Sequence, residues 1–289
     1  MDINITTKLI ALLGKPLAQS YAARIQNEAF AAEGLDYYYF PIEVGNDGLK
    51  TVIDAARVMN FAGLVVTKPN KVVACNLVDG LDPLAEAMGT INTIVKTEDG
   101  KLIGHNTDGL ACVKSLQADG KVNVSKSTFF CIGAGGVGRA IGYTLAYSGA
   151  AKIYITDISP TTAQSLYDAI EFKYPGVAEV VDMNDLPAVY QAAGQSDIVM
   201  NLTGLGMGQT IGQMPFSEKL FHKGQLAFDA IYNPAVTKFL EVAEKAGCQI
   251  LNGMSMNIYQ GCIGFELHTG HKAPLAQMQK TVCNILAGK

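Results

Sequence analysis

The chain has 289 residues, 49% hydrophobic and 17% charged, with a formal net charge of −4. Because an ordinary domain has ~150 residues, this length predicts two domains, each with its own core. The slightly negative charge argues against a nucleic-acid partner. No apolar run reaches the ~18 residues of a membrane span, and no signal peptide is evident, so we expect a cytoplasmic protein without a membrane partner. Six scattered cysteines, with no C-x-x-C pair, predict free thiols.

The first half of the chain alternates between two kinds of segment. Short apolar runs of β-type composition are separated by Ala-rich stretches of helical character. We expect strands at 9–13, 37–41, 63–67 and 93–96, and helices at 22–33, 49–59 and 84–88. This order is typical of βαβ units around a mainly parallel sheet. Residues 98–101 resemble a hairpin turn, so the segment 102–105 should return antiparallel to the strand before it.

A polar stretch at 117–126 separates this half from a second series of the same kind. The sequence predicts helices that end at 147 and span 161–172, and strands near 128–132, 152–156, 178–181, 198–202 and 225–230. The residues from Gly253 onward are again helical in character. The whole pattern predicts an α/β protein with two βαβ series.

A glycine-rich loop directly follows the predicted strand at 128–132. Residues 133–138 read Gly-Ala-Gly-Gly-Val-Gly and fit the G-x-G-x-x-G pattern of dinucleotide-binding loops. The first two glycines permit a tight turn and the close approach of a pyrophosphate, and the last lets the next helix pack closely on the strand. The predicted cofactor site therefore comprises Gly133, Ala134, Gly135, Gly136, Val137 and Gly138.

The strand after the glycine loop ends in an acidic residue, Asp157. A carboxylate at this place can accept hydrogen bonds from both ribose hydroxyls of an adenosine, and it repels a 2′-phosphate. Because no Arg or Lys occurs at 158–161, the sequence predicts NAD as the cofactor, with NADP less favoured. Asp157 could also cap the following helix, which is compatible with a ribose contact.

Polar residues gather beside three predicted strands in the first half: they follow the first and the third strand and stand at the start of the second. They lie at 67–71, at 92–93 and at 106–109. Ligands of α/β sheets bind where the carboxyl ends of parallel strands meet, and a lysine, a carboxylate, amides and hydroxyls there suit a polyhydroxylated small molecule. Each of these residue types is also common in ordinary surface turns.

Taken together, these motifs resemble those of the shikimate dehydrogenase family, including its quinate/shikimate branch, over almost the whole chain. Besides the glycine loop, the matching segments are Gly14–Ala22, Val65–Lys71, Gly89–Thr93, Gly104–Gly109, Asn201–Met207, Asp229–Tyr232 and Gly253–Gln260. The resemblance implies a mixed, mainly parallel α/β substrate domain of residues 1–110, completed by 253–289. It also implies a Rossmann-like, doubly wound dinucleotide-binding domain of residues 111–252.

The resemblance also implies an activity, which is reversible hydride transfer between a ring secondary alcohol and a nicotinamide. Lys71 and Asp108 match the catalytic pair of the family. Removal of hydride from an alcohol leaves a hydroxyl proton, and a lysine near a carboxylate can accept that proton and return it. The residues that match substrate contacts are Ser20, Thr67, Asn92, Tyr232 and Gln260. The residues that match the cofactor path beyond the glycine loop are Thr203, Ala230, Gly253 and Met256.

The chain departs from the family pattern at its substrate end. Gln19 replaces a histidine, Ala22 a serine and Val65 an asparagine. A lost hydrogen bond to a charged group typically costs ~1.5–3 kcal/mol, so recognition of a ring carboxylate should be altered. Either the anchor is rebuilt, for example with Lys15 or Tyr21, or the substrate is a different cyclitol or an amino-substituted, aminoshikimate-like ring.

Two alternatives of other classes remain open. One is a non-catalytic NAD-binding regulator that kept the fold, against which the Lys71–Asp108 pair argues. The other is a folate-linked dehydrogenase of similar architecture, against which the motif at 106–109 argues. We expect a small hydroxylated ring acid as the partner and a monomer or homodimer as the assembly. We expect no metal site, because His268 and His271 have no third ligand nearby in the sequence.

Overall fold

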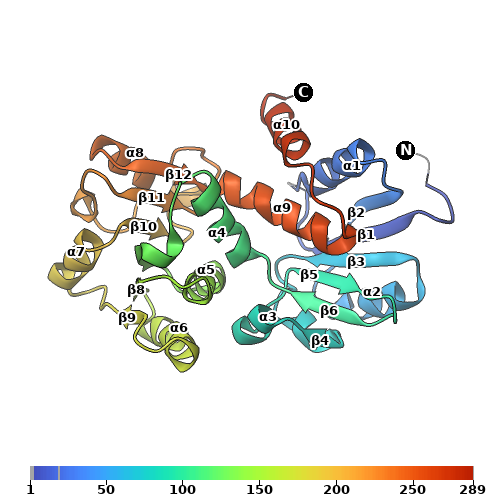
Figure 1. Ribbon diagram of the computed structural model, residues 1–289, viewed down its shortest axis with the longest axis horizontal. Helices are drawn as coiled ribbons and strands as arrows, with labels where there is room; N and C mark the ends of the chain where they lie inside the picture. Colours follow the sequence, from blue (N-terminus) through green and yellow to red (C-terminus); the bar gives the residue numbers. More distant parts are fainter. Residues whose placement is uncertain (1–2, 19, 289) are drawn as a thin grey trace. The chain divides into compact units, whose positions relative to one another are not determined.

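The computed structural model describes residues 3–18 and 20–288, so the departure at Gln19 lies outside the described residues. The chain divides into two compact units (Figure 1). Unit 1 comprises Met1–Thr107 and Ile258–Lys289, and unit 2 comprises Asp108–Asn257. The boundaries between the two units lie at 107/108 and 257/258, whereas the sequence analysis expected the domain boundaries at 110/111 and 252/253. All six cysteines are free.

Unit 1 contains a mixed sheet of six strands in the order β2-β1-β3-β5-β6-β4. β1 pairs in parallel with β2 and β3, whereas β5 runs antiparallel to β3 and to β6. The predicted hairpin return at 102–105 is therefore confirmed. The strands are β1 (Lys8–Gly14), β2 (Tyr37–Glu43), β3 (Phe61–Val66), β4 (Gly80–Leu81), β5 (Thr93–Lys96) and β6 (Leu102–His105).

Helices cover both faces of the unit 1 sheet. Successive side chains of β1 point to opposite faces, and neighbouring residues of this strand therefore belong to two different apolar clusters. Ile10 packs in one cluster with Phe30 and Phe265, and Ala11 packs in another with Ile53. The first cluster lies under α1, α9 and α10, and the second under α2 and α3. The helices are α1 (Ala22–Ala32), α2 (Asn46–Val58), α3 (Pro83–Met88), α9 (Gly253–Thr269, shared with unit 2) and α10 (Leu275–Leu286), with a 3₁₀ turn η1 (Val73–Leu77).

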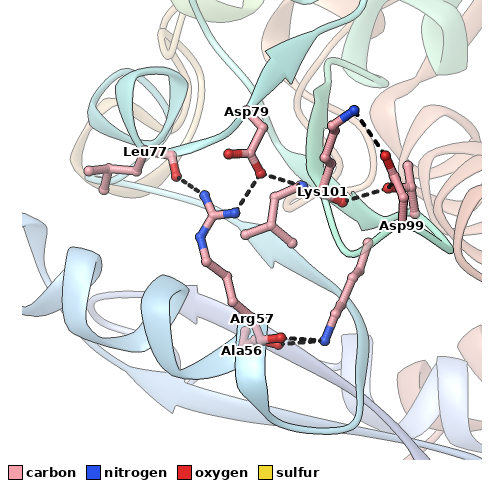
Figure 2. Close-up of polar contacts among 9 residues, drawn as sticks. Ala56, Arg57, Leu77, Asp79, Asp99 and Lys101 are labelled. Carbon is pink, nitrogen blue, oxygen red and sulfur yellow. Dashed lines mark hydrogen bonds and ion pairs between the residues drawn. The ribbon is translucent and has the colours of Figure 1, made fainter.

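A polar contact ties the end of α2 to the turn before β4. The Arg57 guanidinium donates to Asp79 Oδ2 at 2.5 Å and to the Leu77 carbonyl at 3.2 Å (Figure 2). The same Asp79 oxygen accepts the Leu102 N–H at 2.8 Å. One carboxylate therefore holds α2 and β6 to the segment that carries η1 and β4.

Unit 2 contains a parallel sheet of six strands in the order β12-β11-β10-β7-β8-β9. The chain moves outward from β7 through β8 and β9, and then resumes on the other side of β7 with β10. This is the doubly wound order, which confirms the predicted fold class. The strands are β7 (Thr128–Ile132), β8 (Lys152–Thr156), β9 (Ala178–Val180), β10 (Ile198–Asn201), β11 (Leu226–Asp229) and β12 (Gln249–Asn252).

Helices pack against this sheet and bury its apolar strands. Phe130 and Val199 form a core with Val189 and Phe239. The helices are α4 (Asp108–Ala118), α5 (Gly136–Tyr147), α6 (Pro160–Lys173), α7 (Leu186–Gly194) and α8 (Lys238–Lys245), with 3₁₀ turns η2 (Val124–Lys126), η3 (Gly208–Thr210) and η4 (Glu218–Leu220). The sequence analysis did not predict α7, α8 or β12. Throughout the described part of the chain, no helix has the length and apolar character to span a membrane.

Candidate functional site

In unit 1, predicted site residues meet at one edge of the mixed sheet. Thr67 follows β3, and its N–H donates to the Leu13 carbonyl at 2.9 Å. Asn92 precedes β5, and its carbonyl accepts the Val66 N–H at 2.8 Å. Because β5 runs antiparallel to β3, β5 begins where β3 ends, and β6 in turn ends at the same edge. The antiparallel strand therefore brings the segments at 67–71, 92–93 and 106–107 together.

Asn92 fixes the residue that precedes Asp108. The buried amide of Asn92 donates to Thr107 Oγ1 at 2.9 Å, and its Oδ1 accepts the Thr107 N–H at 3.0 Å. Asn106 donates to Thr90 Oγ1 at 2.9 Å. Asp108 itself is buried and is the first residue of α4. The hydrogen bonds of Asn92 and Asn106 therefore fix the backbone that leads into Asp108.

Lys71 belongs to the same edge. Its carbonyl accepts the Ile91 N–H at 3.0 Å, next to Asn92, and its side chain is partly buried. The preceding Asn70 is fully buried and donates from Nδ2 to the Val44 carbonyl at 2.9 Å, which fixes the turn after β3. We call Thr67, Lys71, Asn92 and Thr107 the polar edge of unit 1.

The remaining predicted substrate contacts are distributed over both units. Ser20 is exposed, and its Oγ accepts the Ala22 N–H at 3.3 Å at the start of α1. Gln260 lies on the unit 1 part of α9, whereas Tyr232, 44% exposed, belongs to unit 2. Ala22 and Val65, two of the departures, pack against the apolar cluster of Phe30 and Phe265. These two positions offer packing but no hydrogen bond to a substrate carboxylate.

The glycine loop of unit 2 lies between β7 and α5, beside the point where the strand order reverses. Gly133 has φ +102°, which favours glycine, and a Cβ on Gly138 would lie 2.0 Å from the Gly133 carbonyl oxygen. A Cβ on Gly135 or Gly136 would instead meet open space. The turn is open to solvent at Gly135 and Gly136 and leads into a helix N-terminus, which is the kind of backbone geometry that can accept a pyrophosphate.

A cavity of about 360 Å³ adjoins the loop. It is lined by Ala134, Gly135, Gly136, Arg139, Thr161, Thr162 and Ser165. Arg139 Nη1 donates to Ser165 Oγ at 3.2 Å. A guanidinium, three hydroxyls and the N-terminal ends of α5 and α6 together favour an anionic group.

Asp157 holds the wall of this cavity in place. Its Oδ2 accepts the Ala134 N–H at 2.7 Å, and its Oδ1 accepts the Ser159 N–H at 2.8 Å. The N-cap of α6 is Ser159, whose Oγ accepts the Thr162 N–H at 3.4 Å, so Asp157 does not cap the helix. Both oxygens of the carboxylate therefore bind backbone groups of the loop and the following turn.

The other predicted cofactor residues follow the three strands on the far side of β7. Thr203 follows β10 and donates from Oγ1 to Asn201 Oδ1 at 2.7 Å. Ala230 follows β11 and Gly253 follows β12, and a Cβ on Gly253 would lie 2.1 Å from the Ala230 carbonyl oxygen. Met256 is buried in the unit 2 part of α9. All four lie at the carboxyl end of the parallel sheet.

Comparison with known proteins places these observations in a family. Residues 12–94 match the shikimate dehydrogenase substrate binding domain, and residues 253–283 match the shikimate 5'-dehydrogenase C-terminal domain. The shikimate dehydrogenase (NADP(+)) of Alkaliphilus oremlandii is 36% identical over 285 residues, which cover 97% of this chain and 98% of that protein. The corresponding protein of Listeria innocua is 37% identical over 276 residues, 93% of each chain.

Solved structures agree over nearly the full length. Shikimate 5-dehydrogenase from Listeria monocytogenes, in complex with shikimate and NAD, matches with a TM-score of 0.93 and 33% identity over 98% of each chain. Quinate dehydrogenase from Corynebacterium glutamicum, in complex with NAD, gives 0.87 and 29%, over 96% of this chain and 99% of that one. The 5-ketofructose reductase of a Gluconobacter strain gives 0.86 and 29%, over 98% of this chain and 100% of that one.

These relatives also correct the cofactor prediction. The preference for NAD is wrong, because the curated relatives are named for NADP(+). No cation occurs at residues 158–161, but the cavity that Thr161 lines is also lined by Arg139 of α5. Asp157, on which the prediction rested, binds two backbone N–H groups. With motifs, fold and full-length relatives in agreement, the chain belongs to the shikimate dehydrogenase family.

Proposed function

We propose that this protein is an NADP-dependent dehydrogenase that reversibly oxidises a ring secondary alcohol of a shikimate- or quinate-like acid. The observation that carries the proposal is the polar edge of unit 1. There Asn92 is hydrogen-bonded to Thr107, the residue before Asp108. The carbonyl of Lys71 accepts a hydrogen bond from the N–H of Ile91, the residue before Asn92. A non-catalytic regulator has no need of such an arrangement.

In this mechanism Lys71 and Asp108 handle the proton. Lys71 Nζ accepts the hydroxyl proton as the alcohol becomes a ketone, and it returns the proton in the reverse direction. Asp108 stabilises the resulting ammonium. Thr67 and Asn92 orient the ring hydroxyls by hydrogen bonds. NADP, held by the glycine loop at 133–138 and the cavity lined by Arg139, would supply the hydride acceptor for this oxidation.

The cavity beside the glycine loop supports NADP. The Arg139 guanidinium lies on its wall with the hydroxyls of Thr161, Thr162 and Ser165. A 2′-phosphate carries nearly two negative charges, which a guanidinium and two helix N-termini stabilise. We assign the 2′-phosphate to this cavity and the pyrophosphate to the loop at 133–138.

Substitution of Lys71 tests the proposed function. Lys71→Ala should lower kcat with shikimate or quinate by about 100-fold or more, the usual contribution of a general acid–base group. The Kd for NADP+ should stay within about twofold, because the glycine loop is intact. Lys50→Gln, at an exposed lysine paired with Asp54, is the matched control. An unchanged kcat in Lys71→Ala would contradict the proposal.

A second candidate is an uncharged polyol or keto sugar as the substrate. It is favoured by Ala22 and Val65, which lie in an apolar cluster where the family pattern has hydrogen-bonding side chains. The similar Gluconobacter protein is named for the reduction of 5-ketofructose. Initial rates with shikimate, quinate, an uncharged cyclitol and a keto sugar separate the two substrates. If the first candidate is wrong and the second is right, Ala22→Ser with Val65→Asn should raise kcat/KM for shikimate by about tenfold.

A further inference from the structure

A buried carboxylate at the end of β11 has no part in the proton transfer described above. Asp229 is fully buried. Its Oδ2 accepts hydrogen bonds from Thr237 Oγ1 at 2.6 Å and from Asn201 Nδ2 at 3.1 Å, and its Oδ1 accepts the Ile231 N–H at 3.0 Å. Three donors from three segments thus converge on one acidic group.

Asn201 extends these contacts to the loop after β10. It lies opposite Asp229 in the parallel register of β10 and β11. Its Nδ2 also donates to the Leu205 carbonyl at 3.1 Å, and its Oδ1 accepts from Thr203 Oγ1 at 2.7 Å. We call Asn201, Asp229 and Thr237 the Asp229 cluster. Asp229 accepts hydrogen bonds from Ile231 and Thr237, near the two ends of the loop at 230–237. Asn201 is hydrogen-bonded to Thr203 and Leu205, in the loop at 203–205.

The energetics make the cluster sensitive to the loss of any donor. Burial raises the pKa of Asp229, and hydrogen bonds from Thr237, Ile231 and Asn201 oppose that rise. A buried carboxylate stays ionised only while such donors replace its water. Any movement of either loop that withdraws a donor is therefore unfavourable, so the two loops are held together.

We propose that Asp229 is a positioning residue that locks the loops at 203–205 and 230–237 into the geometry that receives the nicotinamide half of the cofactor. The inference rests on the proposed function and on the family resemblance, which implies that Thr203 and Ala230 lie along the cofactor beyond the glycine loop. The adenosine half binds elsewhere, at the glycine loop and the Arg139 cavity. Loss of the Asp229 cluster should therefore weaken binding of the nicotinamide half of the cofactor and leave binding of the adenosine half unchanged.

Two ligands distinguish this role from a general loss of stability. NADP+ contacts both halves of the site, whereas 2′,5′-ADP lacks the nicotinamide half. In Asp229→Asn and Thr237→Val, the Kd for NADP+ should rise by about tenfold, while the Kd for 2′,5′-ADP stays within about twofold. Thr237→Ser keeps the hydroxyl and should retain the affinity of the unmodified protein for both ligands.

Thr237 also caps α8 by accepting the Leu240 N–H at 3.3 Å, so a capping control is needed. Asp185→Ala removes the cap of α7, where Asp185 Oδ1 accepts the Ala188 N–H at 3.1 Å, and should change neither Kd. Equal weakening of both ligands in Asp229→Asn, or an unchanged Kd for NADP+, overturns the inference. Tight binding of NADP+ with no turnover of any alcohol counts against the proposed function alone. If the unmodified protein binds neither ligand, both proposals fail.

Discussion

His268 is buried in unit 1 with its ring against the sheet. Its Nε2 lies 3.1 Å from the Ile94 carbonyl oxygen, and a Cβ on Gly63 would lie 2.6 Å from its Cδ2. Burial is the main cause that lowers the pKa of His268 to about 4, and the nearby charge of His105 adds to it. The imidazole is therefore neutral at pH 7, and packing and contacts with backbone groups account for its place.

This shift predicts an acid-sensitive stability. The folded pKa is about 4 and the unfolded value is ~6.5, so protons bind the unfolded chain first. The contribution of His268 to the stability of the folded protein is fully present above pH 6.5, and it is lost as the pH falls toward 4. From pH 7.5 to 5.0 this residue should lower the free energy of unfolding by about 2 kcal/mol. Urea titrations of His268→Gln should show a loss smaller by that amount, whereas the exposed His271→Gln should keep the full loss.

Arg139 is the residue on which the choice of cofactor depends. If its guanidinium binds the 2′-phosphate, Arg139→Gln should raise KM for NADP+ by about tenfold and leave KM for NAD+ within about twofold. Steady-state kinetics with both cofactors measure the difference. Arg24→Gln, at an exposed arginine on α1, is the matched control. An equal change for both cofactors would show that Arg139 acts on the loop rather than on the phosphate.

At the scale of elements, the C-terminal end of α2 is held by a lysine from a strand. Lys96 of β5 donates from Nζ to the carbonyls of Ala56, Arg57 and Met59 at 3.2, 2.8 and 3.0 Å. The last carbonyls of a helix have no partner inside the helix, and a cation near them also interacts favourably with the negative end of the helix dipole. One side chain thus joins α2 to the middle of the sheet.

Removal of this cap should destabilise unit 1. Lys96→Met keeps the aliphatic stem but loses the ammonium, and should lower the free energy of unfolding by roughly 1–3 kcal/mol. Lys50→Met removes an exposed ammonium from α2 itself, paired with Asp54, and should cost less than ~0.5 kcal/mol. Chemical denaturation of the two variants gives the comparison. Equal losses would mean that the three carbonyls are satisfied without Lys96.

How far elements can be predicted from the sequence depends on local signals. The strands that became β1, β3, β7 and β10 are short apolar runs, and their positions agree with the predictions to within one or two residues. Helix α7 was missed although Asp185 at its N-cap and Pro187 in its first turn are typical of a helix start. The hairpin at 98–101 predicts that β6 runs antiparallel to β5. The sequence analysis did not predict the antiparallel direction of β5 relative to β3, which brings Asn92 to the polar edge.

Other features of the site arise only in three dimensions. Asn92 bonds to Thr107 across two strands, and Arg139 reaches Ser165 from one helix to the next. No local pattern predicts such pairs, because tertiary packing decides them. The Asp229 cluster joins two parallel strands in the same way. Lys71 and Asp108 match catalytic residues of the family, whereas the contacts that fix the chain around them are evident only in the structure.

At the scale of the whole molecule, cofactor binding should stabilise the two units unequally. NADP+ at 100 times its Kd adds about 2.7 kcal/mol to the stability of the part that binds it. Hydrogen exchange should slow at residues 133–139 and 157–162 of unit 2, whereas amides of β1 and β2 in unit 1 should change little. Slowed exchange in β1 and β2 with none at the glycine loop would contradict the assignment of the cofactor to unit 2.

The core of unit 1 has a consequence for biosynthesis. Phe30 near the start of the chain stacks on Phe265 near its end, with ring centroids 5.2 Å apart, and α10 packs on α1. A ribosome that adds ~5–20 residues per second separates the emergence of these rings by roughly ten to fifty seconds. During that interval unit 2, which is continuous in the chain, can fold, while β1 and β2 wait with one apolar face uncovered. The nascent N-terminal segment is therefore a place where we expect chaperones to bind during synthesis.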